Sequence, residues 1–179
     1  MNNIQPIETY IALIRRCFPQ IEVASAAPIT RGWDSFVLVV NDELIFRFPM
    51  REDVEERFQR EIRLLPVLEP TLSTPIPHFD FIGHGDTPEY PYTFVGYRKL
   101  EGKPLDDEAI SRQQLMALAP ALGAFLSELH RFPVKQARLL EVEGGTPELW
   151  RKDYQERYID LQKRVFPLLD ADERKKSER

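Results

Sequence analysis

The chain has 179 residues, 42% of them hydrophobic and 11% aromatic, which is typical of one soluble globular domain with a sizeable core. Its net charge of −5 argues against a nucleic-acid partner, because phosphate binding needs a clustered basic face. No apolar run approaches bilayer length and no secretion signal is visible, so we expect a cytoplasmic protein without a membrane partner. The single cysteine excludes an internal disulfide, and with three histidines it argues against a structural zinc site.

Residues 1–100 have strand-like and helix-like segments in a mixed order. Helices are expected at 7–18 and 52–68, and strands at 35–48, 74–83 and 92–100. Within 35–48, two β-rich runs flank Asn41 and Asp42, which predicts a hairpin with a tight turn. Pro66 is expected to kink or shorten the end of the second helix.

Residues 101–179 have the pattern of helices alone. Ser111 and Gln114 predict a capping box, and Thr146 and Pro147 predict the N-cap and first position of a later helix. The buried face expected for the first of these helices comprises Leu115, Leu118, Leu122, Phe125 and Leu129. The later helix carries a stripe that we expect to pack in a core, made of Trp150, Tyr154, Tyr158, Leu161 and Val165. The chain therefore divides near residue 101.

The β-rich part contains several features that phosphoryl transfer from a nucleotide requires. Such a site needs a turn over the phosphates, a cation on an adjacent strand, a carboxylate that orients the cation, and a hinge strand. Gly32 and Ser35 can form the turn, although an ordinary strand connection would look the same. Arg47 follows three apolar residues in "ELIFRFP", shares its face of the strand with Ile45, and needs a partner. Glu61 on the following helix is that partner, and a plain structural ion pair is the alternative.

Five ordered segments carry a resemblance to a known family: "RGWDSFVLV", "IFRFP", "REIRLLPVL", "PYTFVGYRKLEGKPL" and "LGAFLSELHRFP". Together they resemble the aminoglycoside phosphotransferase family, in the branch of the 2''-aminoglycoside phosphotransferases, over most of residues 20–132. The resemblance implies a protein-kinase-like fold. The expected fold class is therefore α+β: an N-lobe with an antiparallel sheet of about five strands plus a helix, then the first helices of an incomplete helical C-lobe. The domains are expected to be a nucleotide-binding N-lobe with its hinge (1–100) and a partial C-lobe (101–179).

The resemblance also implies roles for particular residues. The phosphate loop would be Gly32, Trp33, Asp34 and Ser35. Arg47 would hold the phosphates, with Glu61 as its helix partner; the family often has lysine at the position of Arg47, and arginine changes the geometry from a point charge to a fork. Tyr97 would gate the back of the base pocket, and the main chain of Arg98 and Leu100 would hydrogen-bond the purine.

The triplet His84-Gly85-Asp86 matches the opening of the family's catalytic loop, but it stands before the hinge, whereas that loop follows the hinge. The position five residues beyond Asp86 is Pro91, where the family has asparagine. Glycine and aspartate are also common turn residues, so we interpret the triplet as a strand connection. No asparagine follows Asn41 in the chain. We therefore assign no catalytic residue and no metal ligand, and expect the catalytic segment to lie outside this sequence.

These observations lead to two hypotheses. In the first, the chain is the nucleotide-binding portion of a small-molecule O-phosphotransferase that uses ATP or GTP with Mg and a hydroxyl acceptor, and is inactive alone. In the second, it is a non-catalytic, pseudokinase-like module that associates through exposed C-lobe helices, as a dimer or aggregate. If the acceptor is an aminoglycoside, the role of the protein would be antibiotic resistance. The alternative acceptors are a sugar, an amino alcohol or a homoserine-like molecule.

Overall fold

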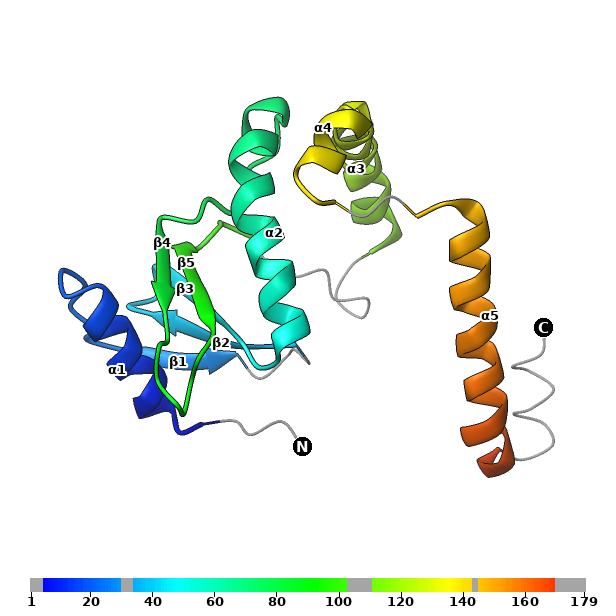
Figure 1. The fold of residues 1–179 in the computed structure, drawn as a ribbon. Helices are drawn as coiled ribbons and strands as arrows, with labels where there is room; N and C mark the ends of the chain where they lie inside the picture. The colour runs from blue at the N-terminus through cyan, green and yellow to red at the C-terminus, as the bar shows by residue number, and fades with distance from the viewer. Residues whose placement is uncertain (1–4, 30–33, 103–110, 143–144, 170–179) are drawn as a thin grey trace. The chain divides into compact units, whose positions relative to one another are not determined.

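The computed structural model describes residues 5–29, 34–102, 111–142 and 145–169 (Figure 1). Its centre is a five-stranded antiparallel sheet with the strand order β1-β2-β3-β5-β4. The strands are β1 (Ala26–Ile29), β2 (Ser35–Val40), β3 (Leu44–Pro49), β4 (Phe81–His84) and β5 (Thr93–Arg98). Two helices, α1 (Ile7–Cys17) and α2 (Glu52–Leu68), pack on the sheet, and the α+β fold class expected from the sequence is confirmed.

The two faces of the sheet have different cores, because side chains alternate along each strand. The face under α1 is aromatic: Phe46, Phe48 and Phe94 are completely buried and pack with Tyr10 of the helix. The face under α2 has a smaller apolar cluster. The aromatic layer therefore contains most of the apolar core.

Two glycines allow the aromatic rings to lie flat on the sheet. Gly96 is the cross-strand partner of Phe46, and Gly83 is the partner of Phe94. A Cβ atom added at either glycine would lie 2.4 Å from the phenyl ring opposite. Each ring thus covers the backbone of its partner strand, and a side chain there would displace it.

The hairpin between β2 and β3 forms as predicted. Asn41 and Asp42 have positive φ angles of 54° and 56°, a conformation that asparagine and aspartate tolerate better than most residues. The side chain of Asn41 accepts hydrogen bonds from the main-chain N–H groups of Ala24 and Ser25 and donates one to the carbonyl of Glu22. The turn therefore also fixes the segment that leads into β1.

The largest difference between an expected and an observed boundary lies before β4. The strand expected at 74–83 begins only at Phe81, because Pro75 and Pro77 have no N–H to donate to a ladder. The helix expected at 52–68 is confirmed. Of the two effects expected of Pro66, the shortening does not occur, because α2 reaches Leu68 and passes into the 3₁₀-helix η1 (Glu69–Thr71), and the kink stays a prediction. Pro66 lies in the last turn, so only one helical hydrogen bond is missing.

The helices after residue 102 are α3 (Arg112–Arg131), α4 (Val134–Leu139), α5 (Pro147–Arg164) and the 3₁₀-helix η2 (Phe166–Leu168). The capping box of Ser111 and Gln114 and the N-cap of Thr146 are confirmed. The compact units of the chain are Met1–Glu141 and Val142–Arg179, and the lobe boundary near residue 101 stays a prediction. Among the helices that the structure describes, none is long and apolar enough to cross a membrane.

The expected burial of the apolar faces of α3 and α5 is wrong. Neither helix has a buried residue, and Leu122 and Trp150 are 57% and 59% exposed. Helical periodicity identifies an apolar face, but burial needs a second surface. Phe125 and Leu129 are partly buried and Tyr158 packs edge-on against Phe166 of η2, while most of each face is uncovered within its own compact unit. Both helices thus present unpaired apolar surface.

Candidate functional site

The ion pair predicted between β3 and α2 is present. Arg47 Nη1 lies 2.8 Å from Glu61 Oε2, and both side chains are partly buried, with exposures of 25% and 34%. The guanidinium carbon of Arg47 lies 4.5 Å from the centre of the Phe58 ring, close enough for a cation–π contact. Strand alternation turns Arg47 toward α2, and α2 presents Glu61 and Phe58 to it. The cation is therefore held at a defined place on this face of the sheet.

Beside Arg47, the strand register places two rows of side chains on the same face. One row runs through Ile29, Val37, Arg47 and Val95, and the other through Ala27, Val39, Ile45 and Tyr97. Val95 is covered by α2, whereas Ile29 on the edge strand is 40% exposed. The apolar members of these rows form a strip next to the cation. Sequence reasoning missed Ile29, Val37 and Val39, although the alternation of the strands could have identified them.

Tyr97 stands at the end of this strip, where β5 leaves the sheet. Its ring centre lies 5.8 Å from that of Phe79, and burial raises the pKa of its hydroxyl. Tyr97 is thus a largely enclosed side chain between the apolar strip and the segment that follows.

Beyond Tyr97 the chain offers main-chain hydrogen-bonding groups at the sheet edge. The N–H of Lys99 donates a hydrogen bond to the carbonyl of Glu43 at 2.8 Å. Hydrogen-bonded and non-hydrogen-bonded residues alternate along an antiparallel strand, so the N–H and C=O of the preceding residue, Arg98, point away from β3. Strand β4 reaches only as far as the partner of Gly96 and leaves that side open. An open groove of about 570 Å³ at this end of the sheet is lined by residues 98–102 together with Asp42 and Glu43 of the β2–β3 turn.

At the start of β2 the structure describes part of the expected phosphate loop. Gly32 and Trp33 lie outside the described residues. Asp34 is turned toward α2, where its carboxylate oxygens accept hydrogen bonds from Arg51 at 2.9 Å and Arg57 at 3.1 Å. The hydrogen bond from Arg51, together with the charges of both arginines, lowers the pKa of the Asp34 carboxyl. Ser35 follows as the first residue of β2.

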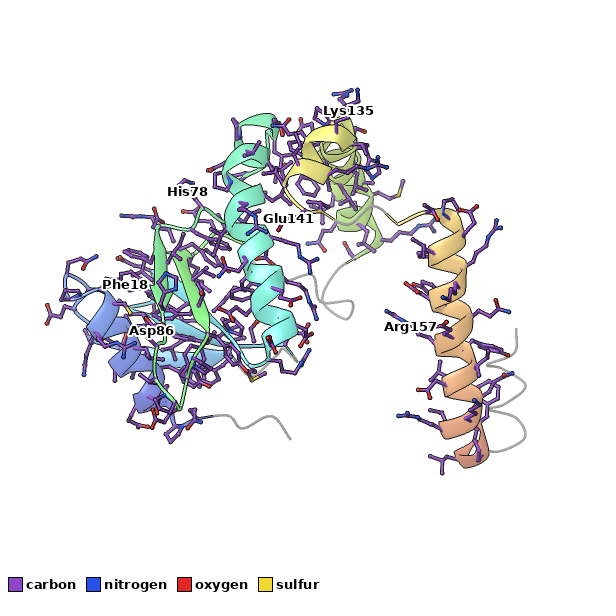
Figure 2. The ribbon with its side chains drawn as sticks, in the orientation of Figure 1. Phe18, His78, Asp86, Lys135, Glu141 and Arg157 are labelled. Carbon is purple, nitrogen blue, oxygen red and sulfur yellow. The ribbon has the colours of Figure 1, made fainter. Side chains whose placement is uncertain are left out.

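The triplet His84-Gly85-Asp86 is confirmed as a strand connection. His84 is the last residue of β4, and the N–H of Gly85 donates to the carbonyl of Tyr92. Asp86, labelled in Figure 2, belongs to the connection to β5 and has a φ angle of 49°. In the described part of the chain, no group of three or more histidine, cysteine, aspartate or glutamate side chains could hold a metal ion.

A model of the phosphotransferase enzyme family, APH, matches residues 25–178. The chain belongs to this family. A search of the curated proteins found no match to this chain.

Solved structures of phosphotransferases have a similar fold. The GDP and kanamycin complex of APH(2")-IIia is 29% identical over 90% of this chain, with a TM-score of 0.79. The GDP complex of wild-type aminoglycoside 2'-phosphotransferase-IIIa is 29% identical over 93% of the chain, with a TM-score of 0.80. For the macrolide 2'-phosphotransferase MphH from Brachybacterium faecium, at 23% identity over 87% of the chain and a TM-score of 0.65, the likeness shows the fold alone. The chain spans about half the length of these structures, covering 53%, 55% and 52% of them respectively.

Proposed function

We propose that the chain is the nucleotide-binding portion of a small-molecule O-phosphotransferase that takes ATP or GTP together with Mg. The observation that carries this proposal is the Arg47–Glu61 pair, which stands next to an apolar strip that ends at outward-facing main-chain groups. A nucleotide needs these three surfaces: a cation for the phosphates, an apolar plane for the base, and hydrogen-bonding groups for the edge of the base.

Each part of the site has a role in this proposal. Arg47 binds the phosphates while Glu61 holds its guanidinium, and a guanidinium can donate two parallel hydrogen bonds to phosphate oxygens. The purine lies along Val39 and Ile45, with Tyr97 closing the back of the pocket. The carbonyl of Arg98 and the N–H of Leu100 bind its edge. Gly32, Trp33, Asp34 and Ser35 form the turn beside the phosphates.

The acceptor is a small molecule with a free hydroxyl group. Three of the similar structures contain aminoglycosides: kanamycin in one at 29% identity, and streptomycin and gentamicin in two others at only 23% identity. An aminoglycoside acceptor would make the role of the whole protein antibiotic resistance. The described residues offer no ligand set for Mg, so no step is assigned to the ion.

We expect little or no turnover from the chain as given. After the hinge its sequence contains neither the His-Gly-Asp triplet nor the asparagine that the family's catalytic loop uses. The lobe boundary near residue 101 is part of this proposal: residues 1–100 bind the nucleotide, and residues 101–179 begin the helical lobe that carries the chemistry.

A second candidate function is a non-catalytic module that acts by association. It is favoured by the apolar faces of α3 and α5, where Leu118 and Tyr154 are 47% and 54% exposed. Mg-dependent phosphoryl transfer by the chain itself would contradict this candidate.

Nucleotide binding by calorimetry tests the proposal, with ATP and GTP, with and without Mg, and with adenosine and guanosine for comparison. We expect Arg47→Ala to weaken triphosphate binding by about tenfold or more, which is the contribution of a charged hydrogen bond, and to leave nucleoside binding unchanged. The matched control is Arg164→Ala, which removes a guanidinium held 2.9 Å from Asp160 on α5. A folded wild-type chain that binds neither triphosphate would overturn the proposal.

A further inference from the structure

Asp34 connects the start of β2 to the first turns of α2. Its two carboxylate oxygens accept from different arginines: Oδ1 from Arg51, just before the helix, and Oδ2 from Arg57, inside it. Its main-chain carbonyl also accepts a hydrogen bond from the N–H of Met50 at 3.3 Å. The side chain of Asp34 is thus attached to Arg51 and Arg57 at the beginning of α2, and its main chain to Met50 in the connection that leads into the helix.

The same two arginines hold a second carboxylate. Arg51 Nε lies 3.0 Å from Asp53 Oδ1, and Arg57 Nη2 lies 2.9 Å from Asp53 Oδ2. Asp34 and Asp53 therefore have the same partners at nearly the same distances and with similar exposure, 46% and 55%. They differ in one respect: Asp53 belongs to α2 itself, whereas Asp34 immediately precedes β2. Of the two carboxylates, Asp34 is the one that links the helix to the start of β2.

The place of this link relates it to the proposed nucleotide site. Ser35, the next residue, begins β2 and pairs with Pro49 at the end of β3. One turn beyond Arg57, the same helix carries Glu61, which holds Arg47. The Asp34 link therefore sets the distance between the residue that begins β2 and the helix that orients the cation.

A free carboxylate beside a triphosphate would repel it, but both oxygens of Asp34 are engaged by guanidinium groups on the side of α2. We infer that Asp34 is a positioning residue for phosphate binding: it does not touch the nucleotide, but holds Ser35 against α2, so that Ser35 and Arg47 reach the same phosphate chain. This inference rests on the proposed function.

The test compares two matched variants of the full chain, Asp34→Asn and Asp53→Asn. Each removes one carboxylate charge from the same pair of arginines, so a merely stabilising network would respond equally to both. We expect Asp34→Asn to weaken binding of GTP and ATP by about fivefold, the scale of a small network of exposed ion pairs, and to leave guanosine and adenosine binding unchanged. Asp53→Asn is expected to leave all four affinities unchanged.

Amide hydrogen exchange on the nucleotide-free variants provides a readout that does not depend on binding. Exchange at Ser35 and Phe36 should become faster in Asp34→Asn and stay as in the wild type in Asp53→Asn. Equal effects of the two variants, or tighter triphosphate binding by Asp34→Asn, would overturn the inference; the second result would mean that the carboxylate only repels phosphate. If the wild-type chain binds no triphosphate, the proposed function fails and the inference fails with it. If the wild type binds and the two variants behave alike, only the inference fails.

Discussion

Replacing Gly96 by alanine tests the close packing between β5 and the aromatic layer. An added Cβ would lie 2.4 Å from Cε1 of Phe46 and 2.7 and 2.9 Å from two further ring atoms. Carbon atoms attract one another at about 3.5–4.0 Å, so the ring would have to move by roughly 1 Å. Phe46 is completely buried, and the rings of Phe48, Phe81 and Phe94 lie around it at centre-to-centre distances of 6.5, 5.8 and 6.4 Å. The strain therefore spreads through the aromatic layer.

Overpacking of this kind costs about 1–3 kcal/mol of unfolding free energy, which corresponds to a fall of about 1 M in the urea midpoint for a domain of this size. The assay is urea denaturation followed by circular dichroism. The matched control is Gly123→Ala in α3, where an added Cβ meets nothing within 4 Å. Alanine has the higher helix propensity, so the control should gain stability by up to about 1 kcal/mol in its helix.

A second variant isolates the contact itself. Phe46→Leu removes the ring that the new methyl group would meet, so the additional cost of Gly96→Ala should be smaller in that background. An unchanged midpoint for Gly96→Ala alone, or the same additional cost in both backgrounds, would refute the reasoning.

Three further predictions follow from single contacts. Thr146→Ala should destabilise the start of α5 by about 1 kcal/mol, because the Thr146 hydroxyl accepts a hydrogen bond from the N–H of Leu149. Amide hydrogen exchange in the first turn of α5 should become faster in this variant, and unchanged exchange would contradict the prediction. His78 donates a hydrogen bond from Nδ1 to the carboxylate of Glu69, which raises the pKa of His78 above its ordinary value of 6.5. The pair therefore adds stability in full below pH 6.5 and loses it as the pH rises through the folded-state pKa. An NMR titration should show this raised pKa, and Glu69→Gln should lower it; an unshifted histidine would show that the pair does not form. Leu122→Glu should reduce any self-association seen by light scattering without lowering the urea midpoint, because that side chain is 57% exposed; a lowered midpoint would mean that the face is already covered.

Local signals in the sequence were enough to predict the hairpin, α2 and the Arg47–Glu61 pair. Strand alternation fixes the face on which Arg47 lies, and the next helix supplies a carboxylate within reach. Alternation could not show that Asp34 meets Arg51 and Arg57, because that contact depends on the angle at which α2 leaves the sheet.

The apolar face of α3 shows a second limit of sequence reasoning. The spacing of Leu115, Leu118 and Leu122 identifies the side of the helix that avoids water, but not whether another element covers it. Covering depends on the rest of the fold, and this chain matches only about half the length of the related structures.

Neighbouring residues of β3 belong to opposite faces of the sheet: Phe46 and Phe48 to the aromatic layer, Ile45 and Arg47 to the face of the proposed site. The loss or gain of one residue inside this strand would exchange the two sets. The guanidinium would then enter a layer of phenyl rings without a carboxylate, and a phenyl ring would face Glu61. Stability and nucleotide binding would be lost together. Insertions and deletions in this chain are therefore expected in the connections between strands, and single-residue insertions or deletions are not expected within β3.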